Sequence, residues 1–146
     1  MKKVSLIKRI ICGALLIALC CSLGGCSVYH QYVSESGGVP TTPFGDILIQ
    51  IQSDSMSPVL SAGDKIICQK VDDPGTLSVG DIISFWTVIN GERVIVTHRI
   101  YEIYVGSDGK LIFATKGDNN ISVDALVVHE AEVIGKYARH AILGMF

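Results

Sequence analysis

Hydrophobic and polar residues follow two different patterns along this chain. Residues 10–29 contain no Asp, Glu, Lys or Arg, and an apolar stretch of about 20 residues is long enough to cross a bilayer as a helix. From residue 44 onward, short apolar runs alternate with clusters of Gly, Asp, Asn and Pro. The first pattern predicts one N-terminal transmembrane helix, and the second predicts a mainly β domain.

Several segments of the second region have the β-branched and aromatic content of strands. They are residues 46–51, 65–71, 81–89, 93–105, 110–115 and 127–137. Asn90-Gly91, between the third and fourth segments, is typical of a two-residue hairpin turn. Strands at this spacing, with turn residues between them, predict an antiparallel barrel or sandwich.

The distribution of charge orients the predicted helix. Lys2, Lys3, Lys8 and Arg9 precede it, and no charged residue follows it directly. The positive-inside rule then predicts a single-pass protein of the cell membrane with its folded domain outside the cytoplasm. The predicted parts are a cytoplasmic basic segment (1–9), a membrane anchor (10–29), a linker (30–43) and an extracytoplasmic domain (44–146).

Two other interpretations of residues 10–29 stay open. The segment could be a cleaved secretory signal, or a lipoprotein signal in which Cys26 of residues 23–26 (LGGC) is lipidated. All three interpretations put the folded domain on the same side of the membrane.

The composition argues against several other classes of protein. A chain with 49% hydrophobic residues is not expected to be disordered, and a net charge of -2 does not suit binding to nucleic acid. Cys68 is the only cysteine of the predicted domain, and the four histidines lack metal-ligand spacing. We therefore expect no intradomain disulfide, no metal and no other cofactor, while the oligomeric state stays open.

One polar segment, residues 52–58 (QSDSMSP), follows a predicted strand and ends in proline. Ser55 could present its hydroxyl at this bend as a nucleophile, with Ser53 and backbone N–H groups stabilising an oxyanion. The alternative is a polar turn closed by Ser and Asp without any catalytic role.

A second polar segment interrupts an otherwise apolar predicted strand at His98 and Arg99. Side chains alternate along a strand, so His98 and Ile100 share one face while Thr97 and Arg99 share the other. Imidazole changes charge near neutral pH, which suits His98 to act as a general base. The alternative is a histidine that serves only the packing of the core.

The third polar segment, residues 116–120 (KGDNN), follows a predicted strand, and Asp124 comes shortly after it. A carboxylate beside an imidazole fixes its tautomer and stabilises the imidazolium, so Asp118 and Asp124 are both candidates for that task. An ordinary turn is the alternative interpretation.

Taken together and in this order, these segments resemble type I signal peptidases. The resemblance is to the His-containing branch found in the endoplasmic reticulum, archaea and some Gram-positive bacteria, and it covers about residues 44–146. The matching boxes are residues 53–58 (SDSMSP), 79–85 (VGDIISF), 98–99 (HR), 116–120 (KGDNN) with Asp124, and 134–136 (IGK).

This resemblance implies a serine endopeptidase with Ser55 as nucleophile and His98 as general base. It implies Asp118 as the first candidate for the third member and Asp124 as an essential acidic partner, and which of the two orients His98 stays open. Ser53 and the Ser55 N–H are implied for the oxyanion hole. The implied substrates are signal peptides of exported preproteins, cut after a small-x-small motif, and the implied fold is a mostly β catalytic domain with a coiled, barrel-like core.

The strand predicted at residues 46–52 runs directly into Ser55, so an extended substrate could add to its edge. Ile49, Ile51 and Val59 are candidates to line shallow apolar pockets that admit only small side chains. The lipid bilayer is the expected partner of the anchor. Two other functions stay open: a lipid-anchored, non-catalytic β-barrel binding protein at the cell surface, and an inactive signal-peptidase relative.

Overall fold

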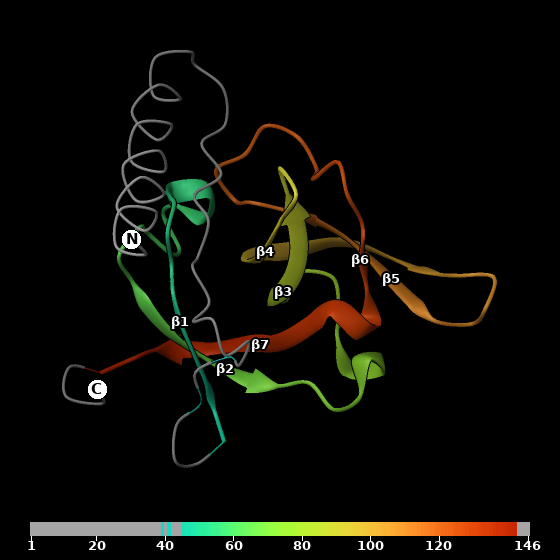
Figure 1. The fold of residues 1–146 in the computed structure, drawn as a ribbon, viewed down its shortest axis with the longest axis horizontal. Helices are drawn as coiled ribbons and strands as arrows, with labels where there is room; N and C mark the ends of the chain where they lie inside the picture. Colours follow the sequence, from blue (N-terminus) through green and yellow to red (C-terminus); the bar gives the residue numbers. More distant parts are fainter. Residues whose placement is uncertain (1–38, 40, 42–44, 143–146) are drawn as a thin grey trace, which may run out of the picture.

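The computed structural model describes Val39, Thr41 and residues 45–142, which form a mainly β domain (Figure 1). The strands are β1 (Ile47–Gln50), β2 (Lys65–Lys70), β3 (Ile82–Ile89), β4 (Glu92–Val105), β5 (Leu111–Lys116), β6 (Val128–His129) and β7 (Val133–His140). Short 3₁₀ helices lie between them: η1 (Asp54–Met56), η2 (Pro74–Thr76) and η3 (Glu130–Glu132).

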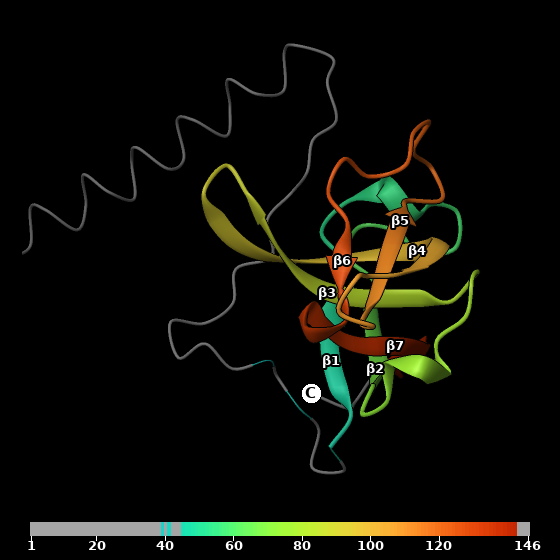
Figure 2. The same cartoon turned by 90° about the vertical axis from the view of Figure 1, so that its right-hand side faces the viewer.

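The strands form one seven-stranded sheet in the order β1-β2-β7-β3-β4-β5-β6, with every neighbouring pair antiparallel. The sheet bends strongly, so that β3 and β7 cross the direction of β1 (Figure 2). The prediction of a mainly β, antiparallel domain is confirmed. The expected closure into a barrel is not: the outermost strands β1 and β6 are only four and two residues long and do not pair with each other.

The strand segments agree closely with those predicted, except the last. Residues 127–137 were expected to form one strand, but η3 divides them into β6 and β7. The cause is a pair of glutamates in η3. The Glu132 carboxylate accepts the His129 N–H at 2.8 Å, and the Glu130 carboxylate accepts the Leu111 N–H at 2.8 Å. These side chains take backbone donors that a continuous strand would have paired with a neighbouring carbonyl.

Two apolar clusters hold the bent sheet together. One joins β1 and β2 to the segment around η1, where Met56 and Leu60 are both fully buried. The other lies between β3, β4 and β5 around Phe113. The first cluster matters for the site, because Met56 anchors η1 and the neighbouring Ser55 is thereby held on the outer side of this turn.

The predicted basic segment and membrane anchor lie outside the described residues, as does most of the predicted linker. In the part that the structure describes, no helix has the length and apolar content needed to cross a bilayer.

Candidate active site

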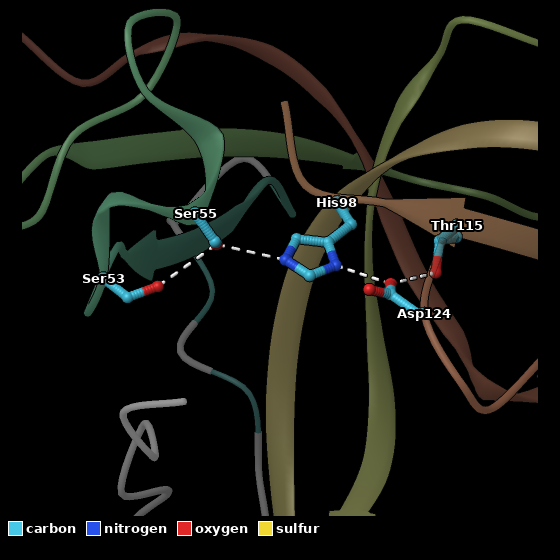
Figure 3. Close-up of polar contacts among 5 residues, drawn as sticks. All are labelled: Ser53, Ser55, His98, Thr115 and Asp124. Atoms are coloured by element: carbon cyan, nitrogen blue, oxygen red, sulfur yellow. Dashed lines mark hydrogen bonds and ion pairs between the residues drawn. The ribbon is translucent and has the colours of Figure 1, made fainter. Parts of the chain in front are cut away.

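Three of the predicted polar side chains lie in a hydrogen-bonded row (Figure 3). The Ser55 hydroxyl lies 3.0 Å from His98 Nε2, and His98 Nδ1 lies 2.6 Å from Asp124 Oδ2. An ionised carboxylate can only accept, so Nδ1 carries the proton and Nε2 is free to accept from Ser55. This is the arrangement of a hydroxyl nucleophile, its general base and an orienting acid.

Ser55 is the central residue of η1, which begins four residues after β1 ends. The turn closes through the Ser57 N–H, which donates to the Asp54 carbonyl at 3.0 Å. The Asp54 carboxylate accepts the Ala62 N–H at 2.9 Å and ties the turn to the following loop. The predicted bend after the first strand is therefore present, in the form of a 3₁₀ turn.

The register of β4 and β5 explains which acid reaches His98. Ile100 pairs with Thr115, and Arg99 pairs with Lys116. Cross-strand partners share a face and neighbours along a strand alternate, so Thr115 lies on the His98 face while Arg99 lies on the other. The two faces of this strand pair therefore offer different partners to the acidic loop that follows β5.

Asp118 and Asp124 divide between these two faces. Asp124 contacts His98, whereas both carboxylate oxygens of Asp118 accept from Arg99, at 2.8 Å from Nε and 2.6 Å from Nη2. This contact raises the pKa of the Arg99 guanidinium, mainly through its hydrogen bonds to Asp118. Asp118, named first from the sequence for the place beside the histidine, is thus paired with Arg99, and Asp124 takes the place beside His98.

Asp124 is itself held from two sides by Thr115, a residue that the sequence analysis did not single out. The Thr115 hydroxyl donates to Asp124 Oδ2 at 2.7 Å, and the Asp124 N–H donates to the Thr115 carbonyl at 2.9 Å. Thr115 has no exposed surface. The signal in the sequence is weak, since a threonine in a predicted strand is ordinary.

The turn formed by residues 117–120 lies against the backbone of η1. The Asn119 N–H donates to the Ser55 carbonyl at 2.8 Å, and the Asn119 side chain donates to the Asp54 carbonyl at 3.2 Å. A Cβ on Gly117 would lie only 2.6 Å from the Ser55 carbonyl oxygen. Glycine at position 117 therefore permits the close approach through which this turn supports Ser55.

Ser53 also contacts Ser55 directly. The Ser53 hydroxyl donates to the Ser55 hydroxyl oxygen at 3.1 Å. The Ser55 N–H lies in the first turn of η1, where no intrahelical carbonyl is available to it. Both donors therefore lie next to the Ser55 hydroxyl oxygen.

A cavity of about 410 Å³ opens beside this row. Its walls include apolar side chains from four segments, namely Ile51, Phe85, Ile95, Val96, Ala125 and Leu126. Of the residues expected to bind substrate, Ile51 lines this cavity, while Ile49 and Val59 do not. Ile49 is 1% exposed because it lies on the inward face of β1 and fills the core, and Val59 lies on the surface beyond η1.

The edge of β1 reaches the same cavity. The N–H and C=O groups of Ile51 bond to Asp64 and Gly63 on the β2 side, both at 2.8 Å. Backbone groups alternate in direction along an extended chain, so those of Gln50 point to the opposite, outer edge. The Gln52 side-chain amide donates to the Gln50 carbonyl there at 3.1 Å, and Thr41 forms a bridge with Ile47 farther back.

No group of three or more His, Cys, Asp or Glu side chains in the described part of the chain could hold a metal ion. The hydrogen-bonded row itself consists of a serine, a histidine and a carboxylate beside a largely apolar cavity.

Comparison with known proteins finds similarity to signal peptidases. The chain is 38% identical over 103 residues to signal peptidase I W of Bacillus subtilis (strain 168), covering 70% of this chain and 52% of that protein. It is 36% identical over 73 residues to the signal peptidase complex catalytic subunit sec11 of Dictyostelium discoideum, covering 50% of this chain and 38% of that protein.

The human signal peptidase complex catalytic subunit SEC11C is 30% identical over 74 residues, covering 50% of this chain and 36% of that protein. The chain thus spans about half or less of the length of these curated relatives. No family model matches the chain. The matched part of the chain is therefore similar to signal peptidases of bacterial and eukaryotic origin.

Proposed function

We propose that this chain is a membrane-anchored serine endopeptidase that removes N-terminal signal peptides from exported preproteins. The observation that carries this proposal is the hydrogen-bonded row of Ser55, His98 and Asp124 at the mouth of an apolar cavity. The similarity to signal peptidases supports the same substrate class. A non-catalytic binding protein would have no use for a nucleophile, base and acid in this geometry.

In the proposed reaction, Ser55 Oγ attacks the scissile carbonyl while His98 Nε2 takes its proton. Asp124 keeps the Nδ1 proton in place and stabilises the imidazolium that forms. When the tetrahedral intermediate collapses, His98 returns the proton to the leaving amine and an acyl-enzyme on Ser55 results. Water then attacks the acyl-enzyme while His98 removes its proton. His98 returns this proton to Ser55 Oγ as the ester bond breaks, and the signal peptide leaves with a free carboxylate.

The proposed oxyanion hole consists of the Ser53 hydroxyl and the Ser55 N–H. Without substrate, the Ser53 hydroxyl donates a hydrogen bond to Ser55 Oγ at 3.1 Å. Rotation about one side-chain bond would turn its proton toward a developing oxyanion. Donors of this kind, placed before the charge develops, lower the barrier of acyl transfer.

The proposed substrate is extended and lies along the outer edge of residues 50–52, next to the cavity. A substrate N–H would replace the Gln52 side-chain amide on the Gln50 carbonyl, since that carbonyl points to the open edge. The residue before the scissile bond would then enter the space bounded by Ile51, Ile95 and Leu126. In this proposed position the apolar walls would reject large side chains by overlap, in agreement with cleavage after a small-x-small motif.

The proposed topology uses the helix predicted at residues 10–29 as a single anchor with the peptidase domain outside the cytoplasm. The bilayer then acts as a second partner, because an anchored enzyme meets signal peptides where they emerge from the membrane. Charge alone would not hold the domain there. The chain beyond the first nine residues is acidic and would be repelled by anionic lipid.

The test is cleavage of a peptide that spans an Ala-x-Ala site, using the full chain in detergent and reading the products by mass. Wild-type protein should cut after the second Ala, and Ser55→Ala and His98→Ala should not. Ser57→Ala is the matched control, because it removes a hydroxyl two residues from the nucleophile that takes no part in the row. Cleavage by Ser55→Ala at the wild-type rate would overturn the assignment.

A second series of peptides would test whether the residue before the scissile bond enters this space. Replacing the last Ala of the motif by Val, Leu and Phe should lower the cleavage rate in that order, because each step adds volume against the cavity walls. Equal rates for Ala and Phe would contradict the proposed position of the substrate.

A further inference from the structure

Thr115 is a buried polar residue that the proposed reaction does not use directly. It lies in β5, has no exposed surface, and follows Phe113 and Ala114, which are also buried. A buried hydroxyl needs a hydrogen-bond partner, and here that partner is the carboxylate of Asp124 at 2.7 Å. A distance this short is typical of a hydroxyl that donates to a charged acceptor.

The oxygen that Thr115 contacts is the one that binds the histidine. Asp124 Oδ2 accepts from Thr115 and also from His98 Nδ1, which lies 2.6 Å away (Figure 3). The two donors come from the adjacent strands β5 and β4, whereas Asp124 lies in the loop after β5. A loop carboxylate with 22% of its side chain exposed is thus fixed by two donors on the sheet.

The backbone of Asp124 is held by the same threonine. The Asp124 N–H donates to the Thr115 carbonyl at 2.9 Å. Thr115 therefore bonds both the backbone and the side-chain carboxylate of Asp124. The remaining freedom of the carboxylate is rotation about its side-chain bonds, and the Thr115 hydroxyl restrains that rotation. Without it, the carboxylate could turn Oδ2 from the imidazole toward water.

We propose that Thr115 is a positioning residue. Its hydroxyl keeps the Asp124 carboxylate turned toward His98, and the carboxylate in turn orients the imidazole. This inference rests on the proposed function, because it assigns Thr115 to the same site. It also adds a requirement beyond Ser55, His98 and Asp124. The side chain at position 115 must donate a hydrogen bond to Asp124, and filling the core is not enough.

Two substitutions separate the positioning role from a packing role. Thr115→Val keeps the shape of the side chain and removes only the donor, whereas Thr115→Ser keeps the donor and removes a methyl group. If Thr115 only filled space, valine would serve at least as well as threonine and serine would be worse, because serine leaves a small cavity. The positioning role predicts the opposite order.

We expect Thr115→Val to lower kcat by about 10- to 100-fold with little change in KM, since a hydrogen bond to a charged acceptor is lost and no substrate contact changes. Thr115→Ser should keep kcat near that of the wild type. Ser84→Ala is the matched control: it also removes a fully buried hydroxyl, one that bonds Thr97 at 2.7 Å, and should lower stability without lowering kcat.

A second readout does not depend on cleavage. The His98 Nδ1 proton, bound to Asp124, should give a far-downfield proton NMR signal, assigned by its loss in His98→Gln. This signal should persist in Thr115→Ser and broaden or disappear in Thr115→Val. Full kcat and an unchanged signal in Thr115→Val would overturn the inference, as would equal impairment of the valine and serine variants.

The proposed function fails on a different result, namely cleavage that survives Ser55→Ala or a wild-type chain that cuts no peptide. In either case the Nδ1 proton signals of Thr115→Val and Thr115→Ser still show whether Thr115 keeps the Asp124 carboxylate bonded to His98.

Discussion

The two acidic residues of the loop after β5 can be separated by one pair of isosteric substitutions. Asp124→Asn and Asp118→Asn each replace one carboxylate by an amide. The structure gives the two carboxylates different partners: Asp124 contacts His98 and Asp118 contacts Arg99. If Asp124 orients the base, as we propose, the two variants should fail in different ways.

The expected loss in Asp124→Asn is one of catalysis. An amide that turns its NH₂ group toward His98 Nδ1 forces the imidazole into the wrong tautomer, with the proton on the nitrogen that must accept from Ser55. By comparison with other hydroxyl-nucleophile triads, this lowers kcat by about a thousand- to ten-thousand-fold. Folding should be affected less, because the backbone N–H of residue 124 still bonds the Thr115 carbonyl and the Thr115 hydroxyl oxygen can accept from the amide NH₂.

The expected loss in Asp118→Asn is mainly one of stability. The substitution removes a two-pronged, charge-assisted contact with Arg99, whose side chain is 35% exposed. Solvent screening at that exposure limits the loss to about 1–2 kcal/mol of unfolding free energy. Because the 117–120 turn supports the Ser55 carbonyl through Asn119, kcat should also fall, by roughly tenfold.

The assay is steady-state cleavage of one peptide by both variants, together with urea unfolding of each. Asp72→Asn serves as the control, since the Asp72 side chain is 79% exposed and the change should affect neither quantity. A greater kcat loss in Asp118→Asn than in Asp124→Asn, at unchanged stability, would refute the reasoning from the β4–β5 register.

Two further predictions follow from individual groups. Burial raises the pKa of the Cys68 thiol to about 11, opposed by its hydrogen bond with Ser84. The folded state therefore holds this proton more tightly than the unfolded state, so its contribution to stability is complete below about pH 9 and declines by about 2–3 kcal/mol as the pH rises through 11. Urea unfolding should show that decline in the wild type and a smaller one in Cys68→Ala, and equal slopes would contradict it. Gly117→Ala should lower both stability and kcat, since the new Cβ would lie 2.6 Å from the Ser55 carbonyl oxygen; wild-type kcat in that variant would mean that the turn does not support the nucleophile.

The strands of this domain were predictable because their signals are local. Asn90 and Gly91 have positive φ angles of 53° and 83°, as the hairpin turn predicted from this dipeptide requires. Alternation also placed His98 and Arg99 on opposite faces of β4 before any partner was known. The split between β6 and β7 was not predictable, because it depends on Glu130 reaching the Leu111 N–H, 19 positions away.

The choice between Asp118 and Asp124 could not be made from the sequence. Both follow β5, and both types of contact are common for aspartate. The outcome depends on the pairing of Arg99 with Lys116 and of Ile100 with Thr115, which fixes the face that each acid can reach. Thr115 was missed for the same reason, because a threonine in a strand acquires a task only when the register puts it beside a carboxylate.

The open sheet, in place of the expected closed barrel, bears directly on the proposed function. Closure would have paired β1 on both sides and left no backbone groups for a substrate. In the described part of the chain, the outer edge of β1 carries only the bridge between Ile47 and Thr41, and the Gln50 carbonyl on that edge is bonded by the Gln52 side chain. The Gln52 side chain would thus cover this edge while no substrate is bound, and an extended peptide could displace it. Gln52→Ala should therefore leave kcat unchanged and lower KM, because the substrate no longer displaces an internal donor; a higher KM would show instead that Gln52 binds the substrate itself.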